Sequence, residues 1–325
     1  MRRLIRPIFR TLVVATLAFG LMQNARAQDY PSRTNVSIVT GLAAGSITDV
    51  IARYLANKLG QLSGQTFVVI NKVGANAIIA GNEVVKAKPD GYTLLFAASS
   101  NYASNHLMYK DHPYNPRTDL LLLSTVTQFG FILLVNKDNP VNSIAELIEQ
   151  LKKKGGGMYG TSSTNMLAAA EMFKAATGTG TQQVLYKSTA DSVRDLMSNQ
   201  VDFVLVDAAY ALAQAKLGHV KPLAVTQAKR SVLAPDIPTM SEAGLPGYEV
   251  NGWMALAAPA HTPQPIVDRL QEWMQKIVAM PETQSFILNL GFEPFYTPPS
   301  QLNAFRDDQI EKWKKLVEIS KIQVQ

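Results

Sequence analysis

The sequence predicts an α/β protein with two domains around a cleft. Short β-branched runs alternate with helical patterns along the chain, and this alternation is typical of parallel sheets. The alternation occurs in two rounds, and the apolar residues between them predict strands that cross from one domain to the other. Small and hydroxyl-bearing residues recur between a strand and the following helix, where α/β proteins bind ligands.

Residues 1–27 predict a secretory signal that is removed from the mature chain. Four Arg precede a short apolar stretch, and Ala25–Ala27 matches a cleavage signal, so the mature protein would begin at Gln28. The signal holds five of the 31 Lys and Arg and no acid, which leaves 26 basic against 25 acidic residues. The mature net charge is then +1 instead of +6 and gives no case for nucleic-acid binding.

Length and composition agree with a two-domain globular protein. The chain has 325 residues, of which 47% are hydrophobic and 17% charged, so it can form a sizeable core. It has no Cys, which excludes disulfides, zinc–thiolate sites and thiol nucleophiles. An exported chain without disulfides suits a bacterial periplasm.

The first predicted strand, Val36–Thr40, is followed by the first indication of a binding site. The loop at 41–45 (Gly-Leu-Ala-Ala-Gly) has little side-chain bulk, and apolar residues then recur with helical spacing from Ile47 to Leu59. Such a loop leaves backbone N–H groups bare at a helix N-terminus, where the helix dipole also favours negative charge. The pattern predicts an anion site without a basic side chain, although many α/β proteins use this turn only for packing.

The segments that follow predict further strands and helices. Strands are predicted at 66–71, 93–98, 131–135, 158–161, 184–186, 202–207, 223–226 and 253–257. Helices are predicted at 77–88, 144–154, 166–177, 191–199, 265–280 and 300–320, and another opens at 99–101. The Pro-rich segment 234–246 predicts a long exposed connection.

Five loops of one kind lie between these strands and helices. They are rich in small, hydroxyl-bearing and amide-bearing residues, and they span 41–48, 74–76, 99–101, 161–165 and 188–191. Each Ser or Thr taken alone is explained by helix capping. Because the carboxyl ends of parallel strands meet at one edge of a sheet, the loops together predict a donor-rich pocket suited to carboxylates.

The sequence contains no complete motif for catalysis, metal binding or a cofactor. Residues 160–164 (Gly-Thr-Ser-Ser-Thr) differ from a nucleophile elbow at the last position, and no phosphate-binding or dinucleotide fingerprint occurs. The four His show no metal-binding spacing. We predict no catalytic residue, no metal and no cofactor, with a periplasmic hydrolase using Ser162 or Ser163 as an alternative.

Several segments of the mature chain resemble a known family. They read YPSRTNVSIVTGLAAGSITDVIAR (30–53), PDGYTLL (89–95), NPVNSIAEL (139–147), LAVTQAKR (223–230), PDIPTMSEAGLPGYEV (235–250) and APAHTP (258–263). In order and spacing they resemble the Bug-type periplasmic solute-binding proteins of tripartite tricarboxylate transporters. The resemblance implies a type II periplasmic-binding-protein fold, with two α/β domains and crossing strands around a ligand cleft. Domain 1 would comprise residues 28–127 and 247–325, and domain 2 residues 128–246.

The resemblance also implies transport without catalysis. Members of the family bind small carboxylates mainly through backbone N–H groups and hydroxyls, and they carry the ligand to a membrane permease. This chain would then be a periplasmic monomer that captures a di- or tricarboxylate or an aromatic acid for the permease subunits of a tripartite transporter. A sensory protein that presents its ligand to a membrane receptor is the alternative.

The ligand-binding residues implied by the resemblance lie in the predicted loops. They are Leu42, Ala43, Ala44, Ile47, Thr48, Ser99, Asn101, Thr161, Ser163, Thr164, Asn165, Thr189, Asp191 and Asp207. Leu42 replaces a family Phe, which either uncovers the ligand or repacks the loop. Ile47 replaces a Ser, and it either favours an aromatic or aliphatic acid or begins the helix core. Asp191 replaces a Pro, and it either meets a ligand amine or acts as a first-turn acid.

Overall fold

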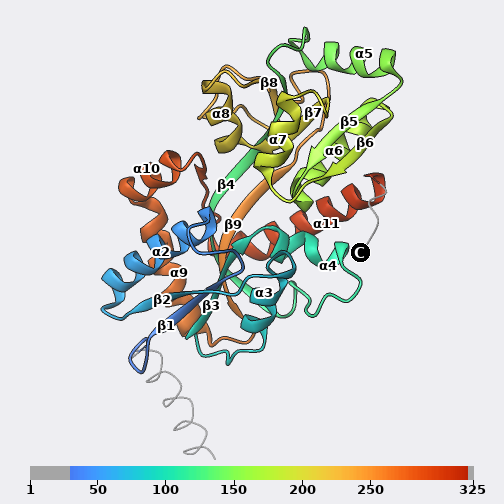
Figure 1. The fold of residues 1–325 in the computed structure, drawn as a ribbon. Coiled ribbons are helices and arrows are strands. Elements are labelled where there is room, and N and C mark those ends of the chain that lie inside the picture. Colours follow the sequence, from blue (N-terminus) through green and yellow to red (C-terminus); the bar gives the residue numbers. More distant parts are fainter. Residues whose placement is uncertain (1–29, 321–325) are drawn as a thin grey trace, which may run out of the picture.

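Two lobes are joined by two long strands, β4 (Leu120–Asn136) and β9 (Asn251–Pro259), with helices packed around the sheets (Figure 1). The computed structural model describes residues 30–320, so the predicted signal sequence at 1–27 lies outside the described residues. Within that range, no helix combines the length and the apolar character that crossing a membrane requires.

The first lobe contains the N-terminal strands and the C-terminal helices. Its elements are β1 (Val36–Thr40), α2 (Ile47–Ser63), β2 (Phe67–Asn71), η1 (Ala75–Ala77), α3 (Ile78–Val85), β3 (Thr93–Ala98), the π-helical turn η2 (Ser100–Ser104), α4 (Asn105–Met108), α9 (Gln264–Ala279), α10 (Pro281–Asn289), β10 (Glu293–Pro294), η3 (Pro299–Gln301) and α11 (Leu302–Ser320). Its strands are ordered β2-β1-β3-β9-β4, and β1 pairs parallel with β2 and β3. The loops after these three parallel strands therefore leave the same edge of the sheet.

The second lobe is formed by the middle of the chain. Its elements are α5 (Ile144–Lys154), β5 (Gly157–Thr161), α6 (Thr164–Thr177), β6 (Thr181–Leu185), α7 (Thr189–Met197), β7 (Phe203–Asp207), α8 (Ala208–Lys216) and β8 (Val220–Val225). β5 pairs parallel with β6 and β7, and β7 and β8 pair antiparallel with the second half of β4. Here too the loops that precede α6, α7 and α8 leave one edge of the sheet.

β4 is one uninterrupted strand whose partners change between two adjacent residues. Gly130 pairs with β9 in the first lobe, whereas Phe131 pairs with β7 in the second. Thr226, which is fully buried, joins the two connections at this point. Its Oγ1 accepts a hydrogen bond from the Phe131 N–H at 2.8 Å and donates to the Val250 carbonyl at 2.6 Å. These contacts do not test the predicted domain boundaries, which stay a prediction.

Helix periodicity is confirmed where the core is built. The predicted apolar stripe of α2 is buried, and Ile51, Leu55 and Leu59 have no exposed surface. Away from the crossing strands, α11 also connects the lobes, since its Trp313 belongs to the same apolar cluster as Ala168 of α6. The two lobes therefore share packed contacts as well as crossing strands.

The prediction of parallel sheets throughout is wrong. β4 pairs antiparallel with β7, β8, β9 and β10, so both sheets are mixed. The reason is that β4 and β9 cross between the lobes, and their direction is set by their partners and not by the local sequence. The predicted strand at 131–135 also extends back to Leu120.

The Pro-rich segment 234–246 is not simply an exposed connection. Met240 is fully buried, and its N–H donates to the Val225 carbonyl at 2.8 Å, while Leu245 is also buried.

Two helices, α8 and α10, were not predicted, because α8 is largely Ala and α10 begins at Pro281 directly after α9. Apolar residues between prolines and an Ala-rich run both weaken the periodic pattern on which prediction rests.

Replacing Gly252 by Ala is expected to destabilise the crossing strands by about 1–3 kcal/mol, since overpacking a filled site forces side chains off their rotamers. A Cβ at this position would lie 2.2 Å from Phe129 Cζ, and Phe129 is itself packed against Phe292. Urea unfolding would measure the loss. In a Phe129→Ala background, Gly252→Ala should lower the free energy of unfolding less. An equal loss in both backgrounds would show that Phe129 is not the side chain that a Cβ at position 252 displaces.

Candidate ligand-binding site

The loop between β1 and α2 is held by a buried carboxylate. Asp49, 2% exposed, accepts from the Gly45 N–H at 2.9 Å and from Asn71 Nδ2 at 2.9 Å. Arg53 donates to both of its oxygens at 2.9 and 3.0 Å. Chiefly because of the hydrogen bond from Arg53, and despite the opposing effect of desolvation, the pKa of Asp49 falls to about 2. The carboxylate therefore stays charged and fixes the loop from inside the lobe.

These contacts correct the expectation that all the loop N–H groups are bare. The Gly45 N–H is bound to Asp49, and the Ser46 N–H donates to the Ala43 carbonyl at 3.1 Å. The Ser46 side chain caps α2 by accepting from the Asp49 N–H. The anion site predicted here is thus confined to the N–H groups of 42–44 and to the first residues of α2.

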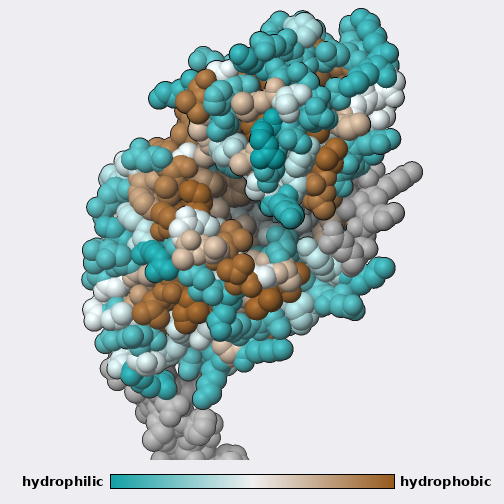
Figure 2. All heavy atoms as spheres, viewed as in Figure 1, coloured by the Kyte–Doolittle hydropathy of each residue, from teal (hydrophilic) through white to brown (hydrophobic). Residues whose placement is uncertain are grey.

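The predicted residues on this loop differ in exposure. Leu42 and Ile47 are 42% and 36% exposed, whereas Thr48 in the first turn of α2 is 3% exposed. Ala43 and Ala44 are exposed. Figure 2 shows the surface hollowed between the two lobes, with apolar side chains beside the hollow. An exposed Ile47 is not part of the core, so the reading in which it begins the helix core is wrong.

Buried polar side chains without partners gather after β3. Ser99 and Asn101 are buried, and the Ser99 Oγ and Asn101 Nδ2 atoms have no hydrogen-bond partner; Ser104 Oγ is in the same state. Tyr114 Oη lies 3.1 Å from Asn101 Oδ1 and donates to it, which leaves the Asn101 amide nitrogen as a free donor. Buried polar groups are usually hydrogen-bonded, so these atoms lack a partner that a bound polar molecule could supply.

In the second lobe the predicted residues surround the start of α6. Ser163 is the N-cap of α6 and accepts from the Met166 N–H at 3.3 Å. Thr161 is fully buried, and its Oγ1 accepts from Gln183 at 2.7 Å. Asn165 Oδ1 is buried without a partner. The first turn of α6 therefore combines a helix N-terminus with an unpartnered amide oxygen.

Ser162 and Thr189 lie together beside this helix end, with 3.1 Å between their hydroxyl oxygens. Ser162 Oγ also lies 3.2 Å from Met166 Sδ. In the part of the chain that the structure describes, the contacts of Ser162 and Ser163 include no His, Asp or Glu side chain that could act as a base. The geometry gives the hydrolase alternative no support.

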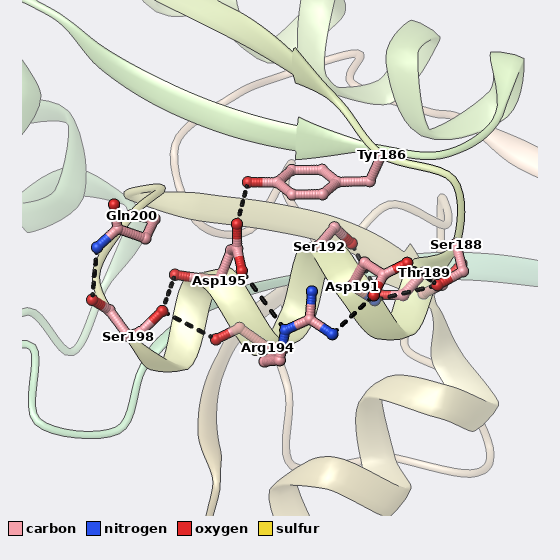
Figure 3. Close-up of polar contacts among 9 residues, drawn as sticks. All are labelled: Tyr186, Ser188, Thr189, Asp191, Ser192, Arg194, Asp195, Ser198 and Gln200. Carbon is pink, nitrogen blue, oxygen red and sulfur yellow. Dashed lines mark hydrogen bonds and ion pairs between the residues drawn. The ribbon is translucent and has the colours of Figure 1, made fainter.

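Asp191 lies at the start of α7 and is engaged within that helix (Figure 3). Its Oδ2 accepts from Ser188 Oγ at 2.7 Å and its Oδ1 pairs with Arg194 at 2.8 Å. The hydrogen bond from Ser188 and then that from Arg194 lower its pKa. Asp207 caps α8 by accepting from the Tyr210 N–H at 2.9 Å, and burial raises its pKa. Both carboxylates therefore have local roles, and their contact with a ligand stays a prediction.

Asn76 brings the two lobes into contact. Its Nδ2 donates to Asn105 Oδ1 at 2.9 Å and to Thr164 Oγ1 at 3.3 Å, across 88 residues of sequence. Three consecutive residues here, Ala75, Asn76 and Ala77, have positive φ angles of 45°, 50° and 65°. A left-handed conformation costs about 1–2 kcal/mol for an ordinary residue, and Asn tolerates it better. Asn76 lies in the predicted loop 74–76 but is not among the predicted ligand-binding residues, although Asn in a loop after a strand is a recognised signal for such a turn.

The site as a whole offers uncharged donors and helix N-termini. Residues from both lobes meet at the carboxyl edges of the parallel strands, and Arg53 is already paired with Asp49. Among the described residues, no three His, Asp or Glu side chains lie together in a way that could hold a metal ion. Such an arrangement can bind an acidic group through hydrogen bonds and helix dipoles.

The comparison with known proteins decides the family. Residues 51–322 match the family described as the tripartite tricarboxylate transporter family receptor. The chain belongs to this receptor family. A solved periplasmic binding protein, BugD, is 32% identical to this chain with a TM-score of 0.76, and the match covers 91% of this chain and all of BugD.

Two further solved structures resemble this receptor. R. palustris Rpa4515, solved with adipate, is 31% identical with a TM-score of 0.79 and covers 90% of this chain and 99% of its own. MatC from Rhodopseudomonas palustris, solved with bound malate, is 25% identical with a TM-score of 0.75 and covers 89% of this chain and 100% of its own. The Bug-type resemblance and the two-domain periplasmic-binding-protein fold predicted from the sequence are confirmed. The family and these neighbours are solute-binding proteins.

Proposed function

We propose that this receptor captures a small organic carboxylate in the cleft and delivers it to the permease subunits of a tripartite transporter. It acts in the periplasm as a monomer, after removal of residues 1–27, and it catalyses no reaction. The adipate and malate complexes of its neighbours support a carboxylate ligand. The observation that carries the proposal is the set of buried, unpartnered donors at the edge of the first lobe, together with the contact of Asn76 from the same lobe with Thr164 at a helix N-terminus of the second.

The ligand charge is held without a basic side chain. The N–H groups of 42–44, the hydroxyls of Thr48 and Thr164 and the amide of Asn101 are the candidate donors, and both α2 and α6 present their N-termini. Contacts of this kind are desolvated when the cleft closes, so salt screens them poorly. We propose the domain division at 28–127 with 247–325 and 128–246 as the two bodies that close.

Thr48→Val and Thr164→Val are each expected to weaken the binding of adipate or malate about ten- to a hundredfold, since a hydrogen bond to a charged group contributes about 1.5–3 kcal/mol. The melting temperature without ligand should change little. Isothermal titration calorimetry measures the affinities, with Thr118→Val as a control in an exposed loop that has no part in the site.

Ionic strength provides the second test of the same proposal. Affinity should change only slightly between low and moderate salt, because the charge is held inside a closed cleft. A steep loss of affinity with salt, or unchanged affinity in both Val variants, would show that a basic side chain holds the acid. Failure of the wild type to bind any organic acid would overturn the proposed function itself.

A further inference from the structure

The hydrogen bonds around Asn76 have a fixed direction. Asn105 Nδ2 lies 3.1 Å from the Asn76 backbone carbonyl, which can only accept, so the amide orientation of Asn105 is set. Its Oδ1 then faces Asn76 and must accept from Asn76 Nδ2, at 2.9 Å. The same nitrogen donates to Thr164 Oγ1, at 3.3 Å. The Thr164 oxygen is therefore an acceptor within the protein, and its own hydrogen remains for another molecule.

We propose that Asn76 is a positioning residue that makes the Thr164 hydroxyl a donor to the ligand. The inference rests on the proposed carboxylate function and narrows it. A ligand acceptor beside Thr164, such as a carboxylate or carbonyl oxygen, takes the free hydroxyl hydrogen. A group that presents N–H or N–H₂ there is disfavoured, because Asn76 already uses one lone pair of the hydroxyl and the hydroxyl hydrogen would be left without a partner. Asn76 thus takes part in specificity through Thr164, without itself needing to touch the ligand.

The local structure supports this role. Asn105 is fully buried at the start of α4, so its amide has no alternative partner in solvent. The left-handed turn at 75–77 turns both the carbonyl and the side chain of Asn76 towards Asn105, and a buried methyl of Ala77 lies against Gly41, where a Cβ would come within 2.1 Å. Since strained backbone persists only where its surroundings enforce it, the turn is held in place by this packing.

The position of Thr164 also favours an acceptor group in the ligand. Thr164 is the first residue of α6, a helix of 14 residues, and the neighbouring Ser163 hydroxyl is already used as the N-cap. The helix dipole attracts negative charge to the same point. The hydroxyl donor and the dipole therefore select the same kind of ligand group.

Two variants test the direction of the chain of hydrogen bonds. Asn76→Gly keeps the left-handed backbone but removes the amide, and we expect adipate to bind about three- to tenfold more weakly. Asn76→Asp supplies only acceptor oxygens, so the Thr164 hydroxyl turns to donate to residue 76 instead of to the ligand. Adipate affinity should then fall further, and the preference for adipate over its monoamide should shrink. Calorimetry with both ligands gives the ratio of the adipate affinity to the monoamide affinity, and a purely structural role for Asn76 would leave this ratio unchanged.

A Thr164→Val background separates polarity from charge. In this background the new carboxylate of Asn76→Asp still repels an anion, but residue 164 no longer has a hydroxyl that the carboxylate could reorient. Both Asn76 substitutions should therefore reduce adipate affinity much less than they do in the wild type. Equal losses of adipate affinity in both backgrounds would overturn the inference while leaving the carboxylate function intact.

A ligand-free measurement keeps the two proposals distinguishable. Thr164→Val should shift the side-chain amide NMR signals of Asn76 and Asn105, whereas Thr118→Val should not. Unshifted signals would overturn the inference directly. If instead the signals shift and the wild type binds no organic acid, the proposed function fails, and the ligand part of the inference fails with it.

Discussion

Replacing Asp49 by Ala is expected to lower the free energy of unfolding by about 2–4 kcal/mol, because it removes a charged acceptor from several donors at once. The Gly45 N–H loses its partner, and Asn71 and Arg53 lose their contacts with the carboxylate. Arg53 is 53% exposed and can return to water, so the loop N–H and the start of α2 account for most of the cost. Because the same loop carries candidate ligand donors, adipate or malate affinity should fall at least about tenfold.

Asp49→Asn is the matched control, since it keeps one oxygen for the Gly45 N–H but loses the charge. Urea unfolding should place it between wild type and Asp49→Ala. An Ala variant as stable as wild type would show that the carboxylate does not hold the loop.

The pH dependence of stability follows from the same carboxylate. The pKa of Asp49 falls from 3.8 to about 2 in the folded protein. Between these values the unfolded chain binds more protons, so the stabilisation is present above pH 3.8 and is lost as the pH falls towards 2. Asp49→Asn should lack this part of the acid-induced loss, which unfolding experiments over that range would reveal.

Replacing Glu293 by Ala is expected to cost about 2–4 kcal/mol, because buried donors at the strand crossing would be left without their charged acceptor. Glu293 Oε1 accepts from Ser231 Oγ at 2.7 Å, and Oε2 accepts from Gln227 Nε2 at 3.1 Å and from Gln128 Nε2 at 3.3 Å. Ser231 and Gln227 are 2% and 7% exposed, so water cannot readily replace the carboxylate. The residue joins β10 to the segment after β8, next to the point where β4 changes partners.

Thermal and urea unfolding would measure the effect of Glu293→Ala. Glu282→Ala is the matched control, since Glu282 is 61% exposed and pairs with Lys58 at the surface, where an ion pair contributes at most about 1 kcal/mol. Equal small losses in both variants would show that Glu293 does not hold the crossing.

Local patterns in the sequence were enough to predict much of the fold. The apolar spacing after the first strand predicted the buried face of α2, and the Ser residues before α5, α6 and α7 are the N-caps. The position of the candidate site could also be predicted, because in parallel strands the loops before helices leave one edge of the sheet whatever the details of packing. Periodicity failed where it is weak, as in the Ala-rich α8, and it carried no information on the direction of β4.

By itself, then, the sequence determined the family and the two-lobed α/β fold, and it predicted the loops of the candidate site. The tertiary structure decided which groups in those loops are free. Asp49 takes the Gly45 N–H from the expected anion site and is itself bound by Asn71, 22 residues away, and Asn76 reaches Thr164 across 88 residues. The physical reason is that a hydrogen bond depends on the direction of both groups, and that direction comes from backbone dihedrals and packing contributed by distant segments.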